Sequence, residues 1–361
     1  MGVRLGINFW QAPWIAFTDP ERLARELDQL AAVGVRDLRI LAGGEGPDDA
    51  GGRVTPALRP APEEWNDRVF EGLELTLRAL EERGMSAILT LGNFWSWSGG
   101  LTQLRDWAGH GPIPTPADGD DFRTHAAGFY ADTRARDLFT AHVDMVVGRL
   151  CGAAAIGVWE ILNEPRGLHD PEGMRAFLDE TAAAIAERDP TTAIATGSEG
   201  STADPEGAGL DFRADHASPH ITLSSCHLWP ENWGLWDPSD PAADLDAVLD
   251  WSRAYLRRHA TIAGELGKPL LFEELGLARD ARALGRGATD ARDRFFAAML
   301  EEANALLAEG LPVRNVCFWT WSGEALGGAA PYPGDPPHEP EGWYGIGPED
   351  HGTLSVLRAH G

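Results

Sequence analysis

Short apolar runs alternate with longer amphipathic stretches along this 361-residue chain. The short runs hold five to eight residues rich in Val, Ile, Leu and Phe, which is typical of buried strands, whereas the longer stretches repeat apolar residues at helical spacing. The strands expected from this pattern are 4–9, 37–42, 86–91, 155–162, 192–196, 221–227, 268–274 and 313–319.

Helices are expected between most of these strands and after the last one. Asp19 is a suitable N-cap for the first helix, and Gly34, Gly84 and Gly267 stand where helices are expected to stop. The expected helices are 19–33, 62–83, 121–150, 171–188, 241–266, 289–309 and 352–359.

Eight strands, most of them followed by a helix, predict parallel strands joined by right-handed crossovers, and that number of strands closes into a (β/α)8 TIM barrel. We expect one such domain over residues 1–361, with long loops at 92–119 and 327–342. The main rival is a doubly wound open sheet. That fold usually carries a Gly-rich nucleotide loop, and no GxGxxG follows the first strand here.

Composition excludes several classes of partner. The formal charge is −26, from 30 Lys+Arg against 56 Asp+Glu, and it would repel nucleic acid. No apolar run reaches the roughly 18 residues that span a bilayer, and no signal-like leader precedes the first strand. We therefore expect no membrane partner and a cytoplasmic location, or secretion if a signal has been trimmed. Three widely spaced cysteines are expected to be buried apolar side chains.

The segment VWEILNEP, residues 158–165, places Glu160 and Glu164 one helical turn apart. Because the run before it, AAAIGV, is apolar and β-branched, we interpret the segment as the end of a buried parallel strand. Asn163 and Glu164 then leave its carboxyl end, and Pro165 prevents the ladder from continuing. Catalytic residues of barrel enzymes lie at such strand ends. Glu160 is expected to have a structural role within the barrel.

Polar side chains and tryptophans converge at the carboxyl ends of the expected strands. Two carboxylates on different strands, with flat rings between them, are what glycosidic bond cleavage requires: one protonates the leaving oxygen, and the other stabilises or captures an oxocarbenium-like centre. The pattern therefore indicates that the partner is an oligosaccharide or a polysaccharide. The converging residues are Asn8, Trp10, Arg39, Asn93, Trp95, Trp97, Asn163, Glu164, Glu199, His227, Trp229, Glu273, Glu274, Trp319 and Trp321.

Three positions have more than one interpretation. In LFEELG, 271–276, side chains alternate along a strand, so only one of Glu273 and Glu274 is expected to face the barrel centre. His227 has three possible roles: proton shuttle, metal ligand or hydrogen-bond donor to a carboxylate. No HExxH or HxH spacing accompanies it, so we favour the donor role and expect no metal. Arg39 either keeps a nearby carboxylate ionised or only forms an internal ion pair.

The motifs taken together resemble a known enzyme family. WEILNEP, the LRI of the second strand, HLWPENW, LFEELG and FWTW are similar to glycoside hydrolase family 5, in the large clan of retaining barrel enzymes. The resemblance covers the chain from GINFW to FWTW. Within the family, LGNFWSWSGG and HLWPENWG are most similar to β-mannanases and β-mannosidases.

The resemblance implies a role for each matching residue. Glu164, which closes NEP, matches the acid/base, and Glu274 matches the nucleophile, which provisionally settles the choice at the seventh strand. Asn163 matches the residue that binds the 2-hydroxyl, and Trp319 the platform beneath the sugar. The expected substrate-binding residues are Arg39, Asn93, Trp95, Asn163, His227, Trp229 and Trp319.

One position departs from the family pattern. The family usually has a tyrosine two residues after the histidine of the sixth strand, where its hydroxyl touches the nucleophile, and this chain has Trp229. An indole N–H donates a hydrogen bond but cannot pass on a proton. Either Trp229 has a modified role, or another residue supplies the contact.

The implied reaction is double displacement with retention, and it needs no metal or organic cofactor. Glu274 attacks the anomeric carbon while Glu164 protonates the leaving oxygen, and Glu164 then deprotonates the incoming water. This requires carboxyl groups about 5–5.5 Å apart. Glu164 is expected to be protonated at the start, because the charge of Glu274 raises its pKa.

The favoured function is an exo-acting β-mannosidase on short β-mannosides, inside the cell. The alternatives are an endo-β-1,4-mannanase on polymeric mannan and a β-glucan specificity with the same chemistry. An alternative of a different class is a non-catalytic sugar-binding barrel, in which the tryptophans remain and the carboxylates do not react. The presence of both glutamates argues against it.

Overall fold

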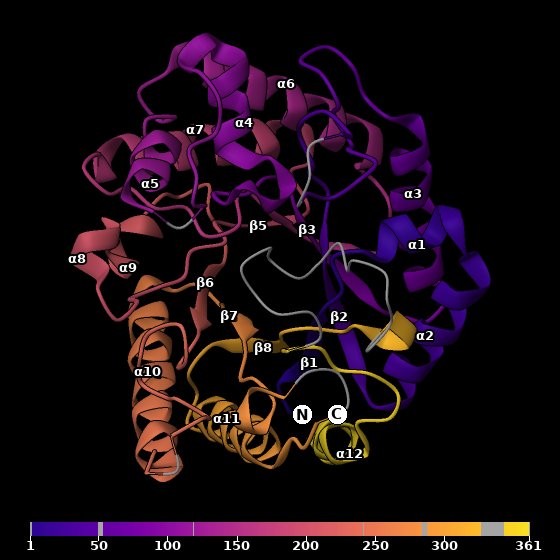
Figure 1. The fold of residues 1–361 in the computed structure, drawn as a ribbon, viewed down its shortest axis with the longest axis vertical. Helices are drawn as coiled ribbons and strands as arrows, with labels where there is room; N and C mark the ends of the chain where they lie inside the picture. Colours follow the sequence, from indigo (N-terminus) through magenta and orange to yellow (C-terminus); the bar gives the residue numbers. More distant parts are fainter. Residues whose placement is uncertain are drawn as a thin grey trace.

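Eight parallel strands form the sheet at the centre of the molecule, in the order β5-β4-β3-β2-β1-β8-β7-β6. The computed structural model describes residues 2–49, 53–117, 119–240, 242–283, 287–325 and 343–360. Figure 1 shows the strands surrounded by helices, as the alternating pattern of the sequence predicts. The strands are β1 Arg4–Asn8, β2 Val35–Leu41, β3 Ser86–Thr90, β4 Ile156–Glu160, β5 Ala193–Ala195, β6 Ser224–Leu228, β7 Leu270–Leu275 and β8 Val313–Phe318.

β5 and β6 are the two ends of the sheet, and they meet at a seam. Hydrogen bonds bridge this seam just before β6 begins. The backbone N–H groups of Thr222 and Leu223 both donate to the carbonyl oxygen of Ile194 at 3.0 Å. The Ile194 N–H in turn donates to the hydroxyl of Thr222 at 2.8 Å. These bonds bring the two ends of the sheet together, and the architecture is a nearly closed (β/α)8 barrel, as expected.

Helices cover the outside of the strands, and side-chain caps begin several of them. Asp19 accepts a hydrogen bond from the Arg22 N–H at 3.0 Å and caps α2, as expected. In the described part of the chain the α-helices are α1 Ala12–Thr18, α2 Pro20–Ala32, α3 Asp67–Glu81, α4 Gly100–Arg105, α5 Asp120–Ala127, α6 Thr133–Leu150, α7 Pro171–Arg188, α8 Pro205–Ala208, α9 Phe212–Asp215, α10 Leu245–Leu266, α11 Asp290–Ala308 and α12 His351–His360.

The helix expected at 121–150 is two helices, because Asp132 interrupts it. Its carboxylate accepts from the N–H groups of Arg134 and Ala135 at 3.0 and 3.2 Å. Asp competes for backbone donors in this way and favours a helix start over a helix interior. For the same reason, Asn66 starts α3 several residues later than predicted.

Loop regions contain short helices that the hydrophobic pattern does not predict. The expected long loop at 92–119 carries α4 and short 3₁₀ and π turns. The helices α1, α8 and α9 were also not predicted, because they are too short to show an amphipathic period. The expected eighth loop at 327–342 lies outside the described residues.

The barrel interior holds an apolar layer below the strand ends. Register pairs Arg39 with Ile88 and Ile88 with Val158, so these side chains share one face of the sheet. Ile88 and Val158 belong to a small buried cluster that is separate from the larger core between strands and helices. None of the helices in the described ranges is long and apolar enough to cross a membrane.

Two of the three cysteines are buried as expected. Cys226 and Cys317 are free thiols in strands β6 and β8. Cys151 is also free, but it is exposed, so the expectation of burial was wrong there. It directly follows α6 and caps its C-terminus, where the chain turns toward β4 at the surface.

Candidate active site

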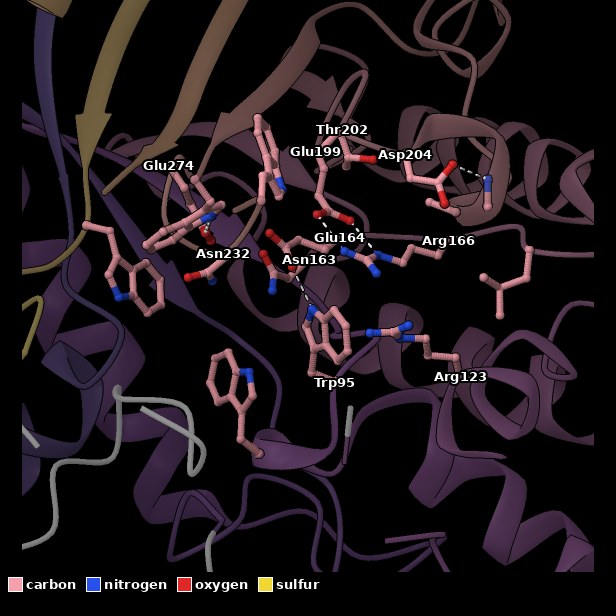
Figure 2. Close-up of a pocket in the computed structure, with 18 of the residues that line it drawn as sticks. Trp95, Arg123, Asn163, Glu164, Arg166, Glu199, Thr202, Asp204, Asn232 and Glu274 are labelled. Carbon is pink, nitrogen blue, oxygen red and sulfur yellow. Dashed lines mark hydrogen bonds and ion pairs between the residues drawn. The ribbon is translucent and has the colours of Figure 1, made fainter. Parts of the chain in front are cut away.

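A cavity of about 720 Å³ opens at the carboxyl ends of the strands (Figure 2). Both predicted catalytic carboxylates, Glu164 and Glu274, lie on its wall. The lining also includes Trp95, Trp97, Asp120, Arg123, Asn163, Arg166, Leu168, Glu199, Thr202, Asp204, Trp229, Asn232, Trp233, Trp319 and Trp343.

Glu164 lies four residues beyond β4, in a strained backbone conformation. Its φ is +54°, a value that non-glycine residues rarely adopt. The backbone is held on both sides, because Asn163 N donates to the Gly92 carbonyl at 2.8 Å and Glu164 N donates to the Gly197 carbonyl at 2.9 Å. Strain of this kind persists only where the surroundings impose it and is concentrated at functional sites. Here it points the carboxylate into the cavity.

Two N–H donors fix the carboxylate of Glu164. His227 Nδ1 lies 2.8 Å from Oε1, and the indole Nε1 of Trp95 donates to Oε2 at 2.6 Å. The Trp95 ring itself contacts a parallel Phe122 ring, 5.9 Å away, and the guanidinium of Arg166, 4.8 Å away. His227 is thus next to a carboxylate, as its expected donor role requires, whereas Trp95, which we expected to bind substrate, also donates to the same acid.

A bulge in β7 brings two neighbouring glutamates into the barrel. Register pairs Cys226 with Phe272 but His227 with Glu274, so β7 has one extra residue between these pairs. Glu273 and Glu274 are both buried, and both lie within 4 Å of His227. The expectation that only one of them faces the centre was therefore wrong, because a bulge breaks the alternation on which it relied. Of the two, only Glu274 lines the cavity.

Glu274 is also held by two donors from different strands. Arg39 Nη1 donates to its Oε1, and the indole of Trp229 donates to its Oε2 at 3.2 Å. The tryptophan that replaces the usual tyrosine thus keeps the contact to this carboxylate. It does so through a donor that has no acceptor capacity.

The two acids lie close together. One carboxylate oxygen of Glu164, one of Glu274 and a ring nitrogen of His227 all lie within 4.8 Å of one another. This agrees with the short separation of retaining glycosidases, as opposed to the longer one that leaves room for a water molecule in inverting enzymes.

Arg39 lies inside the barrel and donates hydrogen bonds to residues on or just after β4 and β7. The guanidinium is fully buried and binds both oxygens of Glu160, at 2.8 and 2.6 Å. It also donates to the side-chain oxygen of Asn163 at 2.7 Å, in addition to Glu274. Glu160 has the structural role expected of it, as the anchor of Arg39. Arg39 therefore orients a candidate substrate-binding amide and the candidate nucleophile together.

Asn93 has an indirect place in the site. Its side-chain oxygen accepts a hydrogen bond from Asn163 Nδ2 at 3.1 Å, and its amide donates to Ser98. The residue is fully buried and is not part of the cavity wall. We had expected it to bind substrate, but its geometry is that of a support for Asn163.

Charges inside the site move the pKa values of Glu164 and His227 apart. Burial alone would raise the pKa of Glu164, but the hydrogen bond and charge of His227, with Arg166 and Trp95, lower it to about 2. Burial alone would lower the pKa of His227, but Glu274 and Glu164 raise it to about 10. These shifts favour the proton on the imidazole, 2.8 Å from Glu164, and the pKa of Glu164 is shifted in the opposite direction to the expected rise.

The carboxylate pair and His227 also have the spacing of a metal cluster. Each of the four carboxylate oxygens, however, accepts a hydrogen bond from a different side chain, and the guanidinium of Arg39 supplies a positive charge beside them. The donor set is therefore that of a hydrogen-bonded acid pair.

Tryptophans surround the other walls of the cavity. Trp319 lies at the end of β8 and lines the cavity, in the place expected of a platform. Trp229 packs edge-on against Trp319, with ring centroids 5.8 Å apart, and against Tyr344 at 5.1 Å. This packing keeps the Trp229 indole over the carboxylate of Glu274.

Sequence reasoning missed the charged side of the cavity. Arg166 follows the NEP motif directly and holds both oxygens of Glu199, at 2.6 and 2.8 Å. Its place next to Pro165 was the available signal. The other missed residues come from α5 and from loops, where no pattern points to a site; they are Asp120, Arg123, Thr202, Asp204 and Asn232.

Known proteins with similar sequences are glycoside hydrolases. The family model described as GH family 5 beta-mannosidase-like matches residues 3–361. Mannan endo-1,4-beta-mannosidase 7 of Arabidopsis thaliana is 27% identical over 61% of this chain, and mannan endo-1,4-beta-mannosidase 4 of Oryza sativa subsp. japonica is 28% identical over 82%. The chain spans 53% and 64% of the length of these two relatives.

A solved structure is similar over almost the whole chain. The glycoside hydrolase family 5 mannosidase from Rhizomucor miehei is 30% identical, with a TM-score of 0.87, over 99% of this chain and 92% of that one. A mutant of the same enzyme, in complex with mannosyl-fructose, matches with a TM-score of 0.89 and the same identity and coverage.

Proposed function

This chain belongs to glycoside hydrolase family 5, in its β-mannosidase-like group, and we propose on this basis that it hydrolyses β-mannosidic bonds. The observation that carries the proposal is the pair Glu164, just beyond β4, and Glu274, on β7, with one carboxylate oxygen of each no more than 4.8 Å apart in the cavity. That separation favours double displacement with retention of the anomeric configuration.

In the first half of the reaction Glu274 attacks the anomeric carbon. A bond forms between this carbon and a Glu274 oxygen, and the bond to the leaving oxygen breaks. Glu164 gives the leaving oxygen a proton and takes one from His227 across their 2.8 Å hydrogen bond. Because the bond to sugar removes the charge of Glu274, the imidazolium loses a partner and releases its proton more readily.

In the second half a water molecule attacks the same carbon from the side of Glu164. Glu164 accepts the proton of this water and returns a proton to His227, and the bond to Glu274 breaks. The sugar is released and the charges of the resting site are restored. Trp229 and Arg39 stabilise the carboxylate of Glu274 as it leaves.

The remaining predicted residues are suited to holding the sugar. Asn163 lies on the cavity wall, held by Arg39 and Asn93, in a position for the hydroxyl next to the reacting carbon. Trp319 offers a ring face on which an apolar sugar face can rest. On the leaving-group side, Arg166 and Glu199 offer charged groups to sugar hydroxyls.

Short β-mannosides with exo cleavage are the substrate mode that we favour. The cavity volume of about 720 Å³ lies within the range of small-molecule pockets. The Rhizomucor miehei neighbour, which matches 99% of this chain, is a mannosidase. Cleavage inside polymeric mannan is the second candidate, supported by the names of the plant relatives.

Initial rates on aryl β-mannoside, aryl β-glucoside and a series of mannooligosaccharides test the proposal. We expect β-mannoside to be preferred, with mannose lost one unit at a time. Internal cuts would favour the endo mode, and faster glucoside cleavage would favour a glucan specificity. No turnover of any of these, with oligosaccharide still bound, would favour a sugar-binding barrel. An inverted product anomer, seen by NMR, would overturn the mechanism.

A further inference from the structure

Glu273 is a buried carboxylate beside His227 that the double displacement does not use. It is fully buried one residue before Glu274 and is not part of the cavity wall. Its Oε2 lies 3.8 Å from His227 Nε2, whereas the opposite ring nitrogen, Nδ1, binds Glu164. This distance is too long for a direct hydrogen bond and short enough for a strong charge interaction in a buried site.

No group in the described part of the chain gives either carboxylate oxygen of Glu273 a hydrogen bond. His227 Nε2 is also without a hydrogen-bond partner there. A buried carboxylate with no donor is costly. The nearby imidazolium is therefore the main compensation for the charge of Glu273. The dependence is mutual, because the same carboxylate is the nearest charged group on the Nε2 side of the ring.

The charged and titratable groups that face Glu273 come from five strands. Burial and the charge of Glu160 raise the pKa of Glu273 to about 7, against the lowering influence of His227 and Arg39. The carboxylate of Glu273 therefore changes its charge near neutral pH. The facing groups are Arg39 of β2, Glu160 of β4, Cys226 and His227 of β6, Glu274 of β7 and Cys317 of β8.

We propose that Glu273 is a positioning residue on the Nε2 side of the His227 ring. The charge of its carboxylate determines how readily His227 gives its proton to Glu164. The inference deepens the proposed function, because it concerns the acid step of that reaction. An ionised Glu273 keeps the proton on His227. When Glu273 is protonated, its charge attraction for the imidazolium is lost, and the proton moves toward Glu164.

The proton transfers of the acid step and the base step balance. In the acid step one proton leaves His227 Nδ1 and one leaves Glu164 for the departing oxygen. In the base step both transfers reverse, with water as the source. Glu273 gains and loses no proton in the cycle; it acts only through its charge on the opposite side of the ring.

The direct test measures the pKa of His227 without substrate. Imidazole ¹⁵N signals are followed by NMR over pH 5 to 11 in the full chain, and His227→Asn identifies the signal. We expect Glu273→Gln to lower the pKa of His227 by about one unit or more, as the loss of a close buried charge does. Glu273→Asp, which keeps the charge, should leave the value near that of the wild type.

Glu45→Gln is the matched control. Glu45 is another buried carboxylate whose pKa is raised to about 7 by burial, but its partner is the backbone N–H of Gly100. The same substitution there should leave the pKa of His227 unchanged. Where Glu273→Gln does not fold, Glu273→Leu makes the same comparison with an apolar side chain of similar size.

Kinetics then give a second readout. In Glu273→Gln the basic limb of kcat/KM against pH, which reports the proton on the His227 and Glu164 pair, should move to lower pH, and Glu273→Asp should restore it. A pKa of His227 that is the same in the wild type and Glu273→Gln would overturn the inference and leave β-mannosidase activity standing. A shift without any β-mannoside turnover would support the coupling and reject the proposed reaction.

Discussion

The indole N–H of Trp95 donates a 2.6 Å hydrogen bond to Glu164 Oε2. The ring that makes this bond packs against Phe122 and Arg166, which restrict its orientation before substrate arrives. It stabilises the ionised form of Glu164, which is the form produced when the acid gives up its proton.

Trp95→Phe should therefore slow the reaction without destroying the site. The phenyl ring keeps the stacking but removes the donor, and a hydrogen bond to a charged group contributes about 1.5–3 kcal/mol, which corresponds to a loss of roughly ten- to hundredfold in kcat. Trp251→Phe, on α10 away from the cavity, is the control for a general effect of losing an indole. Equal rates for Trp95→Phe and the wild type would show that the bond has no catalytic value.

Glu164→Gln should separate substrates by leaving group. General acid catalysis is worth about 10²–10⁴-fold for a poor leaving group, whereas an activated aryl glycoside leaves without protonation. We expect the first half-reaction of the variant to slow greatly for mannooligosaccharides and little for dinitrophenyl β-mannoside, measured as kcat/KM. Equal losses for both substrates would remove the acid role from Glu164.

Gly276→Ala should reduce activity through Trp229. A Cβ at position 276 would overlap the Trp229 ring, and so would push the indole away from Glu274. We expect a fall in kcat of about tenfold, for one weakened hydrogen bond to a charged group. Gly148→Ala is the matched control: its Cβ would meet no atom within 4 Å, in the interior of α6, and alanine there should stabilise the fold by about 0.5–1 kcal/mol.

The seam between β5 and β6 should make the fold sensitive to acid. Burial lowers the pKa of His216 to about 4 and that of His259 to about 3. The neutral rings of His216 and His259 accept hydrogen bonds from the backbone N–H groups of Ser225 and Ser201, respectively. Below pH 6.5 the unfolded chain binds protons that the folded chain does not, so stability falls as pH falls toward these folded values.

Each of these histidines adds up to about 1.4 kcal/mol per pH unit to the slope of stability below pH 6.5. Urea unfolding at pH 7.5, 6 and 5 measures that slope. His216→Gln should lower stability at pH 7.5 and flatten the slope, whereas His351→Gln, at an exposed ring on α12, should change neither. A slope that is identical in His216→Gln and the wild type would reject the assignment.

The sequence predicted the barrel because its signal is repeated. Each strand and helix needs only a hydrophobic period and a cap, and eight repetitions of that pattern leave few other architectures. Glu164, Asn163, His227 and Arg39 could be placed for the same reason, since each lies at or near the carboxyl end of a strand whose position was clear. The contact of Trp229 with Glu274 could not be predicted, because the motif left open whether Trp229 or another residue makes it.

What the sequence could not predict depends on local irregularity. The bulge in β7 follows from the fit between three strands and leaves no mark in the letters FEEL. The preference for a proton on His227 likewise depends on its distances to three carboxylates, two on β7 and one on the loop after β4. Arg166 was missed because it lies on a loop, where spacing carries no information on direction.

The extra residue in β7 determines which acid reaches the cavity, but it does not determine the architecture of the barrel. A deletion of one residue there would restore a regular ladder, with every helix in place, yet would withdraw one of two adjacent acids from the interior. In this barrel a difference of one residue in strand length thus decides whether one or two acids enter the interior, while the strands and helices around it keep their places.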